Sequence, residues 1–283
     1  MSDSHDAPGR PDRPPPYVLG SDAAEVARLE AQALSIAQPT MALLQAAGIG
    51  EGMRVLDLGT GLGHVSLLLA QLVGPSGEVV AIDQDARMLE HAEERRVAAG
   101  VEHVRYLEGD ARTFRDDEPF DAVVGRLVLF HLPDAEHVVR HHVEGLRPGG
   151  VFAAIDFDVG AARSEPPIEL LATLVGWMLA AFRAAHADPT IGTRLVPLLA
   201  AAGLVGVTGF GIQGYVTPDD PRGPVMVAAV VRSLAPQIMA SGIATEAELD
   251  LPTLETRIAD AVRDAGAVIL MPTVSGAFGR RAG

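Results

Sequence analysis

The chain has 283 residues and a formal net charge of −15, and all 22 of its basic residues are arginine. This balance argues against a nucleic-acid partner, which requires a basic surface. The chain has no cysteine, which excludes disulfides, cysteine nucleophiles and thiolate metal sites. It has no run of 18 or more apolar residues, so we expect no membrane span. Because the N-terminus lacks the features of a signal peptide, we expect a cytoplasmic protein.

The first half of the chain predicts an alternating α/β domain. Residues 1–16 hold five prolines and predict a disordered tail, and 17–283 is expected to form a single domain. Residues 21–47 predict a helix, capped by Ser21, that Pro39 should break in two. Beyond it, short apolar runs alternate with helical patterns, which predicts a parallel sheet with helices on both faces. The expected strands are 55–58, 78–82, 103–107, 119–125 and 151–155.

The second half has a less regular pattern of longer elements. Its apolar periodicity and its glycine and proline positions predict four helices and two strands. The helices are 164–186, 190–202, 221–240 and 252–264, and the strands are 204–217 and 266–280.

Residues 53–64 carry the strongest functional signal, because an apolar strand enters three glycines at alternate positions and a helix follows at once. The glycines are Gly59, Gly61 and Gly63. Glycines let the backbone approach a ligand, and a helix N-terminus offers free N–H groups. A dinucleotide-binding turn would have glycine in place of His64, and Asp57 would repel a diphosphate but attract a cationic amine. S-adenosylmethionine (SAM) has that amine and no phosphate; a plain strand-to-helix turn is the alternative.

Two acidic residues downstream fit the same ligand. Asp83 follows the strand at 78–82, about 20 residues beyond the glycine turn, where such folds bind a pair of ribose hydroxyls. Asp110 follows the strand at 103–107 and could accept a hydrogen bond from an adenine amino group. Carboxylates accept such hydrogen bonds strongly, so both positions indicate an adenosine.

Five motifs occur in order along the chain: VLDLGTGLG, AIDQD, EGDA, FDAVVGRLVLFHLPD and LRPGG. With them, residues 50–158 resemble the SAM-binding half of class I methyltransferases, in a branch similar to the ubiquinone/menaquinone-biosynthesis methyltransferases and their natural-product relatives. The resemblance implies SAM as cofactor and a Rossmann-like, seven-stranded, mostly parallel sheet with an antiparallel last strand. In this family the last two strands form a hairpin, whereas here 218–265 lies between them. We interpret 17–47, 157–186 and 218–265 as one helical lid over the cofactor.

The predicted cofactor-binding residues follow from these motifs and from the geometry of the family. Arg126 follows the fourth strand and could bind the SAM carboxylate or an anionic acceptor, or form a structural salt bridge. Met88 could pack on the adenine or in the core, and Gln32 and Tyr17 could close the site or be exposed. The full set is Tyr17, Gln32, Asp57, Gly59, Gly61, Gly63, Asp83, Gln84, Met88, Asp110, Ala111 and Arg126.

His131 is the candidate general base, because it follows the fourth strand in a loop that faces the acceptor in relatives, and histidine titrates near neutrality. A packing role is its alternative. Asp156 and Asp158 share one face of a strand, where an acceptor contact, a metal or a polar rim are all open. The chain shows no clear cluster of metal ligands, so no metal is predicted. The predicted acceptor pocket contains Phe130, His131, Asp156, Trp177 and Met178.

We therefore expect a SAM-dependent methyltransferase that acts on a small, mostly apolar acceptor. O- or C-methylation of a quinone-like molecule or a secondary metabolite is favoured by the resemblance. No membrane partner is expected, and a monomer and a homodimer are both open. Two alternatives remain: a SAM-binding cyclase in which methyl transfer is lost or secondary, and a nicotinamide-dependent oxidoreductase.

Overall fold

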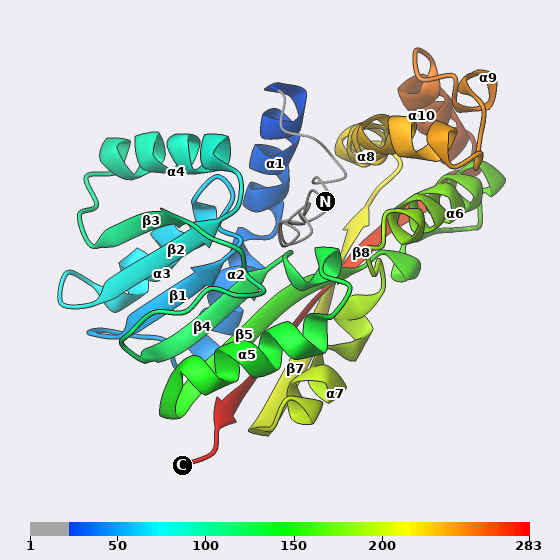
Figure 1. Ribbon diagram of the computed structural model, residues 1–283. Coiled ribbons are helices and arrows are strands. Elements are labelled where there is room, and N and C mark those ends of the chain that lie inside the picture. The colour runs from blue at the N-terminus through cyan, green and yellow to red at the C-terminus, as the bar shows by residue number, and fades with distance from the viewer. Residues whose placement is uncertain (1–22) are drawn as a thin grey trace, which may run out of the picture.

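The computed structural model describes residues 23–283, with side chains described from Val26 onward. The predictions for the tail 1–16, for the Ser21 cap and for Tyr17 fall outside the described residues. Within them, a single eight-stranded sheet runs through the molecule with helices on both faces (Figure 1). This arrangement confirms the predicted α/β class.

Five parallel strands form the first part of the sheet, in the order β3-β2-β1-β4-β5. Their bounds are β1 Arg54–Leu58, β2 Glu78–Asp83, β3 Val104–Glu108, β4 Phe120–Arg126 and β5 Leu146–Asp158. The central strands are apolar on both faces; Val79 to Ile82 of β2, for example, are fully buried. Such continuous apolar runs are typical of parallel strands that are covered on both sides.

The C-terminal strands complete the sheet in antiparallel fashion. β8 (Val268–Arg281) pairs antiparallel with β5, with the short β6 (Arg163–Glu165) and with the long β7 (Leu204–Val216). The predicted antiparallel pairing of the last two strands is confirmed, although 218–265 separates them in the sequence. β6 was not expected, because the helix predicted over 164–186 includes two of its three residues, whereas in the structure α6 begins only after Pro166 and Pro167.

Helices cover the two faces of the sheet unequally. The helices are α1 Ala23–Ser35, α2 Ala37–Ala46, α3 His64–Val73, α4 Ala86–Ala98, α5 Ala135–Gly145, α6 Glu169–Ala184, α7 Leu195–Ala201, α8 Arg222–Ala240, α9 Glu246–Leu249 and α10 Leu254–Ala265. Leucines of α2 and α3 form one core with β1, β4 and β5. The larger core, on the opposite face, combines α5 and α7 with the group α6, α8 and α10, which extends beyond the sheet (Figure 1).

The N-terminal helical segment breaks earlier than predicted. The break falls at Ile36, and Pro39 lies in the first turn of α2 instead of ending a helix. Proline is tolerated there because the first N–H groups of a helix have no intrahelical partner. The connection at Ile36 lets α1 leave the direction of α2 and reach the C-terminal ends of the parallel strands.

Candidate active site

A cleft opens at the C-terminal ends of β1, β2 and β4, between the glycine turn and α1. Its lining brings together ten of the predicted site residues from separate parts of the chain. These are Gln32, Gly59, Gly61, Asp83, Gln84, Met88, Asp110, Ala111, Arg126 and His131. Ligands of open α/β sheets bind at this edge, so the cleft is the candidate active site.

The glycine turn is held in shape by backbone contacts to β2. The Thr60 N–H donates to the Ile82 carbonyl at 2.9 Å, and the Gly61 N–H donates to Asp83 Oδ2 at 2.8 Å. Gly61 has φ 53° and borders the cleft, and a Cβ at this position would meet no atom within 4 Å. The turn therefore presents bare backbone toward a ligand, as the sequence predicts.

Gly63 has a different role from the predicted ligand contact. It has φ 79° and begins α3, and it does not line the cleft. A Cβ here would lie 2.7 Å from Tyr106 Oη and 2.9 Å from the Ala92 side chain. Gly63 is thus required for close packing of the α3 N-terminus against β3 and α4, and its assignment as a ligand contact is not supported by this geometry.

Asp83 stands at the end of β2 with its carboxylate fixed toward the cleft. Besides the Gly61 contact, its Oδ1 accepts from the Asp85 N–H at 3.0 Å. Burial raises its pKa, and these backbone hydrogen bonds act in the opposite direction. Each oxygen keeps acceptor capacity on the cleft side, which suits a pair of hydroxyl groups.

Asp110 is paired with a cleft residue that the sequence analysis did not identify. Arg112 Nε lies 3.0 Å from both Asp110 oxygens, and Arg112 Nη2 lies 2.6 Å from Oδ2. Hydrogen bonding from Arg112 lowers the pKa of Asp110. Arg112 follows Asp110 by only two residues, so the spacing could have suggested this pair, but the bidentate geometry depends on the loop.

Arg126 is a partly buried cation in the lining of the cleft. Its Nη1 donates to Thr40 Oγ1 of α2 at 3.4 Å, and within 23–283 no carboxylate lies within ion-pair distance of it. Burial lowers its pKa to about 10, so it stays charged at neutral pH. A charged guanidinium in a partly dry cleft favours an anionic ligand group, and the structural salt bridge considered for it is not seen among the described residues.

Asp57 lies beneath the cleft instead of on its surface. Asp57 is 1% exposed, its carboxyl has no hydrogen bond of good geometry to the described part of the chain, and it is not part of the cleft lining. Burial raises its pKa to about 7, while nearby Thr60 and Arg126 oppose that shift. The predicted contact between Asp57 and the cofactor amine is therefore not supported, because β1 buries this side chain under the glycine turn.

His131 lines the opposite side of the cleft, at the end of the 3₁₀ turn Leu129–His131. Burial lowers its pKa to about 4, and the positive charge of Arg28 in α1 adds to that effect. The imidazole is therefore neutral at pH 7 and can accept a hydrogen bond or a proton.

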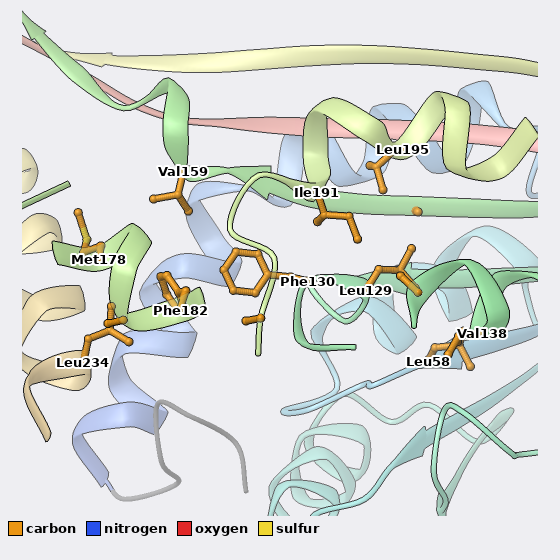
Figure 2. Packing of buried hydrophobic residues seen from close by; sticks show 14 of the residues in the cluster. Leu58, Leu129, Phe130, Val138, Val159, Met178, Phe182, Ile191, Leu195 and Leu234 are labelled. Carbon is orange, nitrogen blue, oxygen red and sulfur yellow. The ribbon is translucent and has the colours of Figure 1, made fainter. Parts of the chain in front are cut away.

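Four other predicted pocket residues lie in the apolar interior and not in the cleft. Phe130 packs edge-to-face on Phe182 of α6, with ring centroids 4.8 Å apart, and Figure 2 shows both within the buried cluster beside Ile191. Met178 is buried in the same cluster, and Trp177 is half-buried against it. Asp156 is fully buried on β5 at the position paired with Ser275. Their predicted acceptor contacts are not supported, because α8 and the 3₁₀ turn Ile191–Arg194 cover this side of α6 and β5.

The rest of the cleft lining includes small and aliphatic residues from distant segments. These are Leu29, Ala33 and Ile36 near α1, Val128, Leu132 and Pro133 after β4, and Ala185 and Ala187 after α6. No residue of 218–265 lines the cleft within the described chain, so the part of the lid assigned to that segment stays a prediction. The helical spacing of apolar residues predicted that α1 is a helix, but it did not predict which side of α1 faces the cleft.

Comparison with known proteins identifies the family. A family model described as "Methyltransferase domain" matches residues 49–190, half of the chain. The chain belongs to this methyltransferase family. The match confirms the class I SAM-dependent methyltransferase predicted from the five motifs, and with it SAM as the cofactor of the family.

Relatives place the chain near one branch of that family. It is 32% identical over 130 residues to the ubiquinone/menaquinone biosynthesis C-methyltransferase UbiE of Pseudomonas paraeruginosa, covering 45% of this chain and 48% of the relative. It is also 32% identical over 116 residues to UbiE of Azotobacter vinelandii, covering 40% and 46%. The match thus spans about half the length of these curated relatives.

Solved structures share the fold at low sequence identity. The YcgJ protein of Bacillus subtilis superposes with a TM-score of 0.57 at 21% identity, covering 87% of this chain and 100% of that one. A putative methyltransferase of Bacillus halodurans gives 0.56 at 21% identity, covering 86% and 99%. These similarities show the fold, a Rossmann-like sheet with antiparallel C-terminal strands.

Proposed function

We propose that this protein transfers the methyl group of SAM to a small, mostly apolar acceptor, with C- or O-methylation favoured. The single observation that supports this most is the composition of the cleft. One end has the glycine turn and Asp83, and the other end has aliphatic side chains around a neutral His131. The UbiE relatives, which are named for C-methylation in quinone biosynthesis, support a quinone-like acceptor.

SAM supplies an electrophilic methyl group on a sulfonium, and the protein's residues hold its remaining parts. We assign the ribose hydroxyls to Asp83 and the adenine to the neighbourhood of Met88, Asp110 and Ala111. We assign the methionine carboxylate to Arg126, because this guanidinium forms no ion pair with a carboxylate among the described residues. These assignments place the sulfonium near His131, with Gln32 of α1 across the cleft.

Positioning provides most of the expected rate enhancement. Holding a nucleophile in line with the methyl group while excluding water can lower a barrier by about 7–11 kcal/mol. The aliphatic residues of α1 and of the loop after β4 serve this role, since they offer no competing hydrogen bonds to the acceptor.

The pKa of His131 limits which acceptors it can deprotonate. An imidazole with a pKa of about 4 is a weak base. Taking a proton from a phenol of pKa ≈ 10 would be uphill by about 8 kcal/mol at ~1.4 kcal/mol for each pKa difference of one. His131 therefore suits an acceptor that is already acidic, such as an enolisable or electron-poor ring, or acts by orienting a carbon nucleophile through a hydrogen bond.

Ligand titration and product analysis test the proposal. Calorimetric titration with S-adenosylhomocysteine, with NADH as the control ligand, should show binding of the first ligand only. Incubation with SAM and a panel of quinols, phenols and enolisable ketones should then give a product heavier by one methyl group. Binding of NADH alone would overturn the proposal, and a cyclised product of unchanged mass would support the cyclase alternative.

A further inference from the structure

The helix α1 lies across the mouth of the cleft and faces it with one side. At about 100° per residue, Leu29, Gln32 and Ala33 fall on one side of α1, and all three line the cleft. By the same rotation, Arg28 and Glu30 flank this side on opposite edges. The helix therefore has a charged residue at each edge of its cleft-facing surface.

Glu30 joins α1 to three parts of the cofactor-binding region. Its Oε2 lies 3.3 Å from His64 Nε2 in the first turn of α3, and its Oε1 accepts from Arg95 Nη2 of α4. Arg95 in turn donates from Nε to the carbonyl of Leu62, within the glycine turn, at 3.0 Å. One carboxylate thus connects the helix over the cleft with the loop beneath it.

Only Glu30 and Arg95 carry charge in this network at neutral pH, because burial lowers the pKa of His64 to about 4, and all three side chains are partly buried. The side chains of His64, Arg95 and Glu30 are 18%, 31% and 35% exposed. Exposed pairs contribute little because water and salt screen them, whereas partly buried networks are screened less. His64 also lines the cleft, so the network borders the volume that a ligand would fill.

Within the described residues, the apolar attachment of α1 is concentrated at its C-terminal end. Among the helices and strands α1 packs mainly on α2, and its Leu34 is 73% exposed. The interruption at Ile36 separates the two helices, and Ala33 and Ile36 are the buried apolar side chains at that end. At its other edge, α1 brings Arg28 close enough to His131 to act on it electrostatically. The helix thus bridges the two sides of the cleft from a connection at one end.

We propose that Glu30 is a positioning residue that holds α1 across the cofactor cleft through Arg95 and His64. The identity of the cofactor rests on the proposed function, whereas the contact between Glu30 and Arg95 does not. When this contact is removed, α1 should open more often and a bound cofactor should leave faster. Because Arg95 also holds Leu62, the effect should depend on the pair and not on Glu30 alone.

The test uses Glu30→Gln, Arg95→Gln, the double variant and Glu136→Gln as a matched control. Glu136 forms an exposed i,i+4 pair with Arg140 on α5, away from the cleft. The first readout is the S-adenosylhomocysteine dissociation rate by stopped flow. The second is limited trypsin cleavage after Arg28, which reports opening of α1 without any ligand, with the cleavage site identified by mass spectrometry.

We expect each single variant to release S-adenosylhomocysteine about fivefold faster than wild type and to be cleaved after Arg28 faster by a similar factor. The double variant should be no worse than the worse single variant, since both remove one interaction. The control should match wild type, and all variants should unfold near the wild-type temperature because these side chains are partly exposed and lie outside the two apolar cores.

Two results would overturn the proposal. In the first, Glu30→Gln and wild type have the same release and cleavage rates. In the second, the fold-change in rate of the double variant equals the product of the fold-changes of the two single variants. If wild type binds no S-adenosylhomocysteine, the proposed function fails, and the cleavage assay alone decides on Glu30. Equal cleavage then rejects the positioning role, and faster cleavage in the variant supports it.

Discussion

Two alanine substitutions in the glycine turn should separate folding from cofactor binding. Gly61 and Gly63 both have positive φ, at 53° and 79°. A Cβ on Gly61 would extend into open space at the cleft, whereas a Cβ on Gly63 would meet Tyr106 Oη at 2.7 Å and Ala92 Cα at 3.2 Å. The two changes share the backbone strain and differ in what the added methyl group contacts.

The structure sets the size of each effect. A left-handed conformation costs a non-glycine residue roughly 1–2 kcal/mol, so Gly61→Ala should lose about that much stability. Gly63→Ala adds overpacking of about 1–3 kcal/mol, for a total of roughly 2–5 kcal/mol. Tyr106 cannot move away freely, because its hydroxyl forms a hydrogen bond with Ser66 Oγ at 2.8 Å. Ala92 cannot move away either, because its Cα is part of the α4 backbone.

Urea unfolding and S-adenosylhomocysteine titration together test this reasoning. Gly63→Ala should have the lower unfolding midpoint, and adding Tyr106→Phe should recover part of the loss because the nearest clashing atom is removed. Gly61→Ala should stay folded but bind S-adenosylhomocysteine at least tenfold more weakly, since its methyl group occupies the cleft. The reasoning is refuted if Gly63→Ala is as stable as Gly61→Ala, or if Gly61→Ala binds like wild type.

Three further predictions concern the buried charged and titrating groups. Arg126→Gln should weaken S-adenosylhomocysteine binding by about 10–100-fold, as expected for a hydrogen bond to a charged group at ~1.5–3 kcal/mol; calorimetry with Arg140→Gln as control checks this, and unchanged affinity would contradict the carboxylate assignment. His131→Asn should lower turnover without changing S-adenosylhomocysteine affinity; because the pKa of His131 is about 4, the wild-type rate should not follow its titration between pH 5 and 8, and a step near pH 6.5 that the variant lacks would contradict this. Asp57 has a folded pKa of about 7 against an ordinary 3.8, so the native state keeps a proton that the unfolded state loses. The free energy of unfolding should therefore fall by about 4 kcal/mol as pH rises from 4 to 7, and Asp57→Asn should remove that slope in urea titrations; equal slopes in both proteins would argue against it.

The cofactor half of the site could be predicted because its geometry is local to each strand end. Adjacent parallel strands end at one edge of the sheet, so Asp83 after β2 had to lie beside the glycine turn after β1, and the bond from Gly61 confirms this adjacency. The strand patterns placed the parallel strands to within a few residues, except that β5 begins at Leu146 and includes the turn motif LRPGG. Side-chain pairs were harder to predict from the sequence. Arg112 hydrogen-bonds both oxygens of Asp110, and this contact depends on a loop conformation that hydrophobic periodicity does not predict.

The acceptor half depends on which helix face is covered, and sequence periodicity does not decide that. The stripe of α6 that contains Met178 and Phe182 is apolar enough to line a pocket, but α8 packs against it (Figure 2). The helices of 218–265 thereby bury a surface whose helical spacing fitted either a core or an acceptor pocket, and the structure shows the core. Some residues that do line the cleft, such as Ala185 and Ala187, are small and apolar, so the sequence has no signal that marks them as site residues.

This division has a physical consequence for how acceptor choice can vary. The contacts assigned to SAM come from strand ends and a glycine turn whose positions the sheet fixes. On the proposed function, the acceptor contacts three segments that contribute apolar side chains to the cleft: α1, the loop after β4 and the residues after α6. Changing the size of one aliphatic side chain in these segments alters the space for an acceptor without touching Asp83 or Arg126. The motifs that identify the family therefore constrain the methyl donor, whereas the proposed acceptor contacts are made by side chains that share only their apolar character.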